Sequence, residues 1–340
     1  MIVIDKKTNQ INNSIDTNMN IKSENETNNS IDMNIKSENE INNSIDTNMN
    51  IKLENNEEID IQKNYEVISK LFGEEFVCYK NETEEDIIKY HINNEKKYMV
   101  DCEYMKKQSD INESMRKILI DWLVDVRYKF EFKSKTLYLC VNIIDRFLSK
   151  KIVARNKLQL VGLVAMMIAA KYQEKHIPEI SEFIHISAYA YTKDELLRME
   201  RVILNTIDFN LNVTTIPMLL SFYINNMNLC GDISFLSQYI CYTAIQELNY
   251  TKYTPCTITK SSLLLSIIIY KLSTYPRPQN KYILNFINYT DLYDCIIFLY
   301  KSAVSQRNTK LTAIRKTFCS ARCNHVARLF AKTSEFIDII

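Results

Sequence analysis

The sequence predicts an all-α protein with tandem five-helix bundles and a disordered, Asn-rich N-terminal tail. The 340 residues include only 3 Gly and 5 Pro, too few for the closely spaced turns of a sandwich or barrel. From about residue 84 onward, apolar residues recur with the period of an α-helix. A series of five helical segments with one very apolar member occurs twice, which indicates two bundles, each built around a central helix.

The N-terminal tail, residues 1–85, has low sequence complexity. The unit Asn-Asn-Ser-Ile-Asp occurs at 12–16, 28–32 and 42–46, and no aromatic residue precedes Tyr65. A segment with so little apolar surface cannot offset the conformational entropy lost on ordering. We therefore predict disorder and assign these repeats no function.

The second predicted domain, residues 86–212, contains an N-terminal helix and the first bundle. An Asp-Ile-Asn-Glu pattern at 110–113 and a capping box from Thr192 to Glu195 mark two helix starts. Pro178 is expected in the first turn of a short helix. The predicted helices are 86–99, 115–129, 136–149, 156–172, one from Pro178, and 192–207.

The second bundle is expected within residues 213–305, followed by a C-terminal segment at 306–340. Its third helix is again the most apolar, as in the first bundle. The similarity between the bundles lies in helix order and hydropathy, because the letters themselves do not match. The predicted helices are 216–226, 233–248, 257–272, 281–287 and 291–304.

The overall charge and the cysteines restrict the class of protein. The chain has 42 Lys and Arg residues and 41 Asp and Glu residues, which gives a net charge of +1. It therefore lacks the overall excess of basic residues that sequence-independent nucleic-acid binding usually needs. Charged residues interrupt every apolar run, and the first residues lack a signal-peptide pattern. The nine cysteines are interpreted as reduced thiols rather than disulfides. We expect a protein of the nucleus and cytoplasm without membrane or nucleic-acid partners.

The helix at 115–129 has two apolar faces instead of one. This pattern fits a buried helix, or a helix with a docking face. Asp125 lies at the rim of the first face, and an apolar groove with an acidic edge suits a peptide carrying a basic residue and a Leu or Phe. The first face contains Met115, Ile118, Leu119, Trp122 and Val126, and the second Ile120, Leu123, Val124 and Arg127.

Two pairs of charged residues lie next to apolar residues of the kind that form a hydrophobic core. Lys171 ends the apolar central helix, and Glu200 lies in mid-helix. Neither charge is favourable in a dry core without a partner, so they either pair with each other near the surface or project toward another protein's backbone. Arg116 and Asp145 form a second candidate pair, which we interpret as structural.

Five motifs over about a hundred residues resemble the cyclin box, in the order and spacing of that family. They are MRKILIDWLVD at 115–125, VNIIDRFL at 141–148, KLQLVG at 157–162, AAKYQE at 169–174 and YTKDELLRME at 191–200. YMKKQ at 104–108 and KTFCSAR at 316–322 are similar to segments of A- and B-type (G2/mitotic) cyclins.

This resemblance implies a regulatory subunit, not an enzyme, which binds and activates a cyclin-dependent Ser/Thr kinase and recruits substrates at G2/M without a cofactor. It assigns kinase binding to Lys171, Glu200 and Tyr172. It assigns structural roles to Arg116, Asp145 and Leu160. Substrate or inhibitor peptides with a basic-x-Leu motif would dock on Met115, Ile118, Leu119, Trp122, Asp125, Leu158 and Gln159.

Two other classes of protein remain as alternatives. A B-class transcription-factor core also has two such bundles, but no cysteine precedes Cys78 here to form its zinc ribbon. An enzyme would need catalytic groups, and the four histidines show no ligand or triad spacing. Cys319, Cys323 and His325 resemble a metal pattern, which we interpret as ordinary helix residues.

The N-terminal tail contains no arginine, so it lacks the Arg-x-x-Leu destruction signal of mitotic cyclins.

Overall fold

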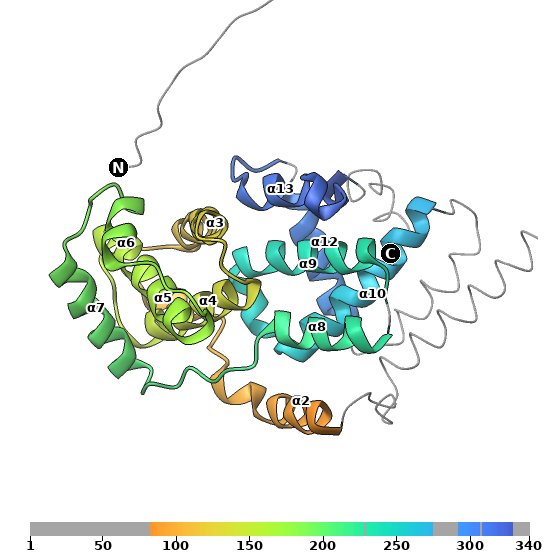
Figure 1. Cartoon of the computed structure of the whole chain (residues 1–340), viewed down its shortest axis with the longest axis horizontal. Helices are drawn as coiled ribbons and strands as arrows, with labels where there is room; N and C mark the ends of the chain where they lie inside the picture. The colour runs from red at the N-terminus through yellow and green to blue at the C-terminus, as the bar shows by residue number, and fades with distance from the viewer. Residues whose placement is uncertain (1–81, 228, 275–291, 307, 329–340) are drawn as a thin grey trace, which may run out of the picture. The chain divides into compact units, whose positions relative to one another are not determined.

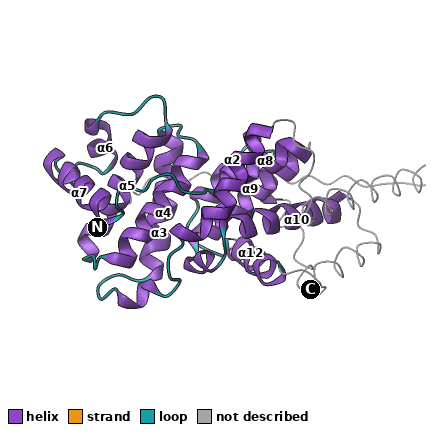
Figure 2. Cartoon of the chain, turned by 90° about the horizontal axis from the view of Figure 1, so that it is seen from below, coloured by secondary structure: helices purple, strands orange, loops and turns teal. Residues whose placement is uncertain are grey.

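The computed structural model describes residues 82–227, 229–274, 292–306 and 308–328. Every regular element in these residues is a helix, which confirms the predicted all-α class (Figure 2). Most of the predicted tail lies outside the described residues. Residues 82–85 do not follow the prediction, because they form the first turn of α2 (Glu82–Asn94). There Glu85 pairs with Lys89 one turn later, and Ile88 is buried in an apolar cluster.

The first bundle is built around α5, as its apolar sequence predicts. Its residues are buried from Leu158 to Ala170 except for Gln159, and it packs against α3, α4 and α7 (Figure 1). Gly162 lets α3 come close, because a Cβ at this position would lie 2.7 Å from Cδ1 of Leu119. The helices are α3 (Glu113–Lys129), α4 (Ser134–Lys150), α5 (Leu158–Gln173), α6 (Ile180–Ile186) and α7 (Lys193–Thr206).

In the second bundle α10 packs against α8, α9 and α12, although α8 is the more apolar helix over its observed length. α13 (Ala313–Phe318) packs against α3 of the first bundle as well as α9. The predicted helix at 281–287 lies outside the described residues. The bundle helices are α8 (Ile216–Met227), α9 (Gly231–Gln246), α10 (Pro255–Thr274) and α12 (Tyr293–Ser305). Short 3₁₀ turns are η1 (Glu95–Tyr98), η2 (Tyr104–Lys107), η3 (Arg155–Lys157), η4 (Leu248–Lys252) and η6 (Ala321–Cys323).

Capping residues start the helices largely where the sequence predicts them. Asn112 accepts a hydrogen bond from the N–H of Met115 (3.0 Å), and Thr192 and Glu195 form the expected capping box. The prediction for Pro178 is wrong. The α6 helix begins two residues later, because Glu179 caps it reciprocally with Glu182.

The helix α2 packs on the second bundle, although it precedes the first bundle in sequence. Ile88 is buried with Leu219 and Leu220 of α8. The buried carboxylate of Glu95 accepts a hydrogen bond from the N–H of Cys256 (2.8 Å) in the first turn of α10. The N-terminal segment therefore ties itself to the start of a helix about 160 residues away.

The eight described cysteines are free thiols, in agreement with the interpretation from sequence. Burial raises the pKa of Cys241 and of Cys295 to about 12, so both stay protonated and behave as core residues. None of the described helices combines the length and the hydrophobicity that crossing a membrane requires.

Replacing Gly162 with Ala tests the close approach of α3 to α5. We expect this variant to be about 1–3 kcal/mol less stable than Gly231→Ala, because only the first substitution forces Leu119 to move. At Gly231, the first residue of α9, the new Cβ would lie 4.0 Å from its nearest neighbour and meets no clash. Urea denaturation gives the comparison, and equal stabilities would contradict the packing argument.

Candidate functional site

A buried ion pair joins the first two helices of the first bundle. Arg116 of α3 and Asp145 of α4 are both no more than 1% exposed. The guanidinium contacts both carboxylate oxygens, with Nε–Oδ1 at 2.7 Å and Nη2–Oδ2 at 2.8 Å. Removing two charges from water is costly, so such a pair needs further hydrogen bonds to be tolerated.

Groups from three other parts of the chain supply these bonds. The hydroxyls of Tyr104 and Tyr250 each donate to one carboxylate oxygen of Asp145 at 2.7 Å. Nη1 of Arg116 donates to the carbonyls of Ile245 and Gln246, both at 3.1 Å, at the end of α9. Burial lowers the pKa of Arg116, but the charge of Asp145 and the other groups around the guanidinium together raise it above the usual value. The pair therefore holds η2, both bundles and η4 in one arrangement.

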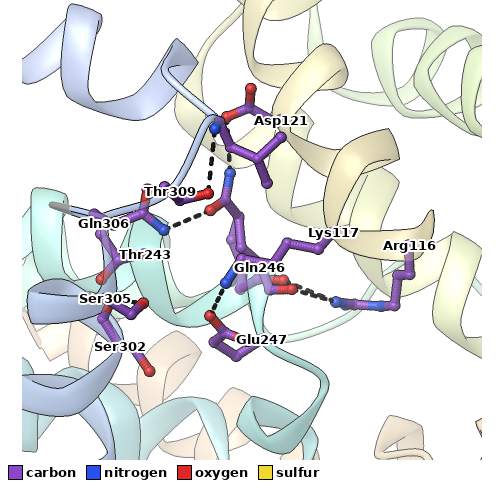
Figure 3. A network of polar contacts seen from close by, with 12 residues as sticks. Arg116, Lys117, Asp121, Thr243, Gln246, Glu247, Ser302, Ser305, Gln306 and Thr309 are labelled. Carbon is purple, nitrogen blue, oxygen red and sulfur yellow. Dashed lines mark hydrogen bonds and ion pairs between the residues drawn. The ribbon is translucent and has the colours of Figure 1, made fainter. Parts of the chain in front are cut away.

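Polar side chains beside this pair form a second connection between the bundles (Figure 3). Lys117 of α3 forms an ion pair with Glu247, just after α9. Asp121 of α3 accepts from Nε2 of Gln246 (2.9 Å), whose Oε1 accepts from Gln306 (2.7 Å) at the end of α12. Lys117 and Asp121 thus contact the second bundle and help to fix the orientation of α3.

The predicted docking residues come together at the crossing of α3 and α5, with unequal exposure. Leu119 and Leu158 are 6% exposed and belong mainly to the core. Ile118 is 42% exposed, and Met115, Trp122 and Gln159 are partly exposed. The second apolar face of α3 is buried at Ile120, Leu123 and Val124, which explains why this helix needs two apolar faces.

Asp125 is exposed at the edge of this surface, and α13 brings a cation near it. Partial burial raises the pKa of Asp125, while the charge of Lys316 acts in the opposite direction. The sequence places Lys316 in a C-terminal motif but gives no sign that it faces Asp125. A docking peptide would therefore meet an acid whose field is partly compensated.

Lys171 and Glu200 pair across α5 and α7 at the surface of the first bundle. The Lys171 Nζ lies 2.6 Å from Oε1 of Glu200, with side chains 41% and 14% exposed. Tyr172, which follows on α5, is 48% exposed. Of the two interpretations from sequence, mutual pairing is the arrangement present here, and the ammonium remains open to a partner. Leu160, at 2% exposure, belongs to the core of α5.

Within the described part of the chain, no three His, Cys, Asp or Glu side chains are grouped as a metal site requires. His325 contacts the carbonyl of Cys319 through Nδ1 instead. Cys319 follows the last residue of α13, Cys323 lies in η6 and His325 lies in the turn after it, so these are not the ordinary helix residues that the sequence interpretation expected.

Two helical bundles locked by a shared buried ion pair, with exposed surfaces on α3, α5 and α7, define the class of fold. Residues 86–212 match the cyclin N-terminal domain, and residues 205–332 match the cyclin C-terminal domain. The chain belongs to the cyclin family, as the five motifs predict.

Relatives of the A and B types share much of the sequence. Cyclin-B2-1 of Oryza sativa subsp. japonica is 42% identical over 179 residues, covering 53% of this chain and 43% of that protein. Cyclin-A1 of Mus musculus is 34% identical over 257 residues, covering 75% and 60%. G2/mitotic-specific cyclin-A of Patella vulgata is 35% identical over 251 residues, covering 74% and 58%. The chain thus spans less than two thirds of the length of these relatives.

A crystal structure of a viral cyclin from Herpesvirus saimiri has the same fold. The TM-score is 0.50 at 19% identity, and the match covers 58% of this chain and 88% of the viral protein. At this identity the likeness shows the fold alone.

The Arg116→Ala variant tests whether the buried pair maintains the fold. We expect a loss of about 3–5 kcal/mol in the free energy of unfolding, because Asp145 would remain buried without its counter-charge. Lys117→Ala is the matched control. It removes a neighbouring, more exposed ion pair and should cost less than about 1 kcal/mol. Denaturant titration measures both, and a similar small loss in each would refute the role given to Arg116.

Proposed function

We propose that this chain is a non-catalytic subunit that binds and activates a cyclin-dependent Ser/Thr protein kinase at G2/M. The main support is the surface pair of Lys171 and Glu200, at the positions where the cyclin-box motif carries its kinase-contacting Lys and Glu. The relatives named as G2/mitotic-specific cyclins support the cell-cycle stage. We further propose that it acts in the nucleus and cytoplasm, with no nucleic-acid or membrane partner.

Both side chains of the pair keep hydrogen-bonding capacity for a partner. An ammonium has three N–H donors and a carboxylate about four acceptor positions, and their mutual hydrogen bond uses one of each. The remaining groups can contact main-chain N–H and C=O groups at the end of a kinase helix. The neighbouring ring of Tyr172 offers apolar contact area beside them.

Activation follows from selective binding of one kinase conformation. A protein kinase works only when its strand Lys and its C-helix Glu pair, and a partner that binds this conformer shifts the population toward it. A shift from 1:99 to 99:1 requires about 5.5 kcal/mol of differential binding. An exposed ion pair supplies at most about 1 kcal/mol. The rigid faces of α5 and α7 must therefore supply the rest.

Substrate recruitment would use the surface at the crossing of α3 and α5. Ile118, Trp122 and Met115 offer apolar contacts for a Leu side chain, and Gln159 can hydrogen-bond an extended peptide backbone. The exposed Asp125 would attract the basic residue of a basic-x-Leu motif. Because Lys316 offsets part of that charge, we propose that the apolar contacts contribute most to selectivity here.

Kinase binding is tested with the double variant Lys171→Ala/Glu200→Ala. We expect at least a tenfold loss in the kinase recovered by co-purification, since two main-chain anchors disappear together. The control, Glu103→Ala/Lys106→Ala, removes another exposed ion pair, on a different segment, and should leave kinase recovery unchanged. Equal recovery with both double variants would exclude the assigned site.

Substrate docking is tested with Trp122→Ala and, separately, Ile118→Ala, in complexes with the kinase. We expect each to slow phosphorylation of a peptide with a basic-x-Leu motif about threefold to tenfold, because apolar contact is lost at the docking surface. A peptide without the motif serves as control and should keep its rate. Ile118 is exposed, so its truncation does not open the core. If both peptides slow equally, the residues act on activation and not on docking.

A further inference from the structure

A pocket of about 390 Å³ lies apart from both proposed surfaces, where the 97–101 segment meets α4 and the turn after α7. Four basic side chains line it and only two acidic ones, an excess of two positive charges. These residues are Lys97, Lys107, Arg146, Lys150, Asp101 and Asp208. The volume falls within the range of pockets that hold small ligands.

Arg146 is the buried member of this group, with 8% of its surface exposed. Nη1 donates to the carbonyl of Asn210 (2.7 Å) and weakly to Oδ1 of Asn142 (3.5 Å), and Nη2 donates to the carbonyl of Ile207 (3.1 Å). The ring of Tyr98 lies 5.0 Å from its Cζ. The guanidinium is thus held in a fixed position, yet none of its hydrogen bonds to the described residues reaches a carboxylate.

Arg116 has a buried carboxylate as its hydrogen-bond partner, and Arg146 has none among the described residues. Asp145 neutralises Arg116 in the core, and the pKa of Arg116 is raised. Burial lowers the pKa of Arg146, and the charge of Asp208 compensates only in part. Buried charges in proteins are normally paired, so an incompletely compensated guanidinium beside a pocket favours an external anion.

The acidic residues at the pocket neutralise its cations only in part. Asp101 accepts from the backbone N–H of Glu103 (2.9 Å), and the side chain of Asp208 is 72% exposed, 3.4 Å from Nζ of Lys150. Lys150 also donates to the carbonyl of Thr206 (2.9 Å). Lys97 and Lys107 are exposed and form no ion pair with a described residue.

We propose that this pocket binds the phosphate of a phosphorylated Ser or Thr on a partner polypeptide. A phosphate monoester carries close to two negative charges and three acceptor oxygens, which suits a fixed guanidinium flanked by exposed ammonium groups. A flat lipid surface would meet the exposed lysines but not the recessed Arg146. A single carboxylate would compensate only half of the excess charge.

The test uses the purified 340-residue chain and fluorescence anisotropy. The probe is a labelled nine-residue peptide pool with a central phosphothreonine between randomised positions. We expect it to bind, its unphosphorylated counterpart not to bind, and inorganic phosphate to compete. Lys97→Gln/Lys107→Gln should weaken binding about fivefold to tenfold, because it removes two cations without touching the core. Lys252→Gln, which removes an exposed charge in the second bundle, is the control and should bind as the parent does.

Three results would overturn the proposal. These are no binding of the phosphorylated pool at about 1 mM, equal binding of the unphosphorylated pool, and unchanged affinity in the double lysine variant. Binding to phosphatidylserine vesicles in place of the peptide pool would also overturn it, since a lipid surface would then be the ligand. No kinase is present in the assay, so its outcome is independent of the proposed kinase activation.

Discussion

The arrangement of the two bundles depends on one buried ion pair and on how completely it is satisfied. Arg116 and Asp145 alone would be costly in a dry core. Two tyrosine hydroxyls and two main-chain carbonyls from distant segments complete their hydrogen bonding. The bonds from Tyr250 and to the carbonyls of Ile245 and Gln246 would be strained or lost if the second bundle shifted against the first. The pair therefore specifies the arrangement more than it adds net stability, and it fixes α3, which carries the proposed docking surface.

The fold was largely predictable because its signals are local. Helical periodicity and few glycines indicate all-α structure, and a capping side chain such as Asn112 or Thr192 acts within one turn. The predicted helix boundaries are wrong where two local signals compete, or where contacts with distant residues determine the structure. A proline such as Pro178 is compatible both with the first turn of a helix and with the position before the N-cap. Because Glu179 is the N-cap of α6, Pro178 lies before the helix. The turn at 82–85 is held through Ile88, whose partners lie more than a hundred residues away.

The candidate site was predictable as a set of residues but not as a set of contacts. Lys171 and Glu200 stand out in sequence because charges there interrupt apolar helices. Their pairing depends on how α5 packs on α7. The ion pair of Lys117 with Glu247 and the approach of Lys316 to Asp125 depend on the second bundle and α13, which no local pattern reveals. Burial of Leu119 likewise follows from the closeness that Gly162 permits.

The fixed orientation of α3 bears directly on the proposed binding of partners. α3 presents one face to the core and another to solvent, and polar contacts of Lys117 and Asp121 with the second bundle help to fix its orientation. A surface that is already ordered loses little conformational entropy on binding, so more of the contact energy remains for selecting one conformation of a partner. Arg146 is likewise held in a fixed position before binding. Main-chain carbonyls hold it in place while its charge stays incompletely compensated, so its position is set before any anion arrives.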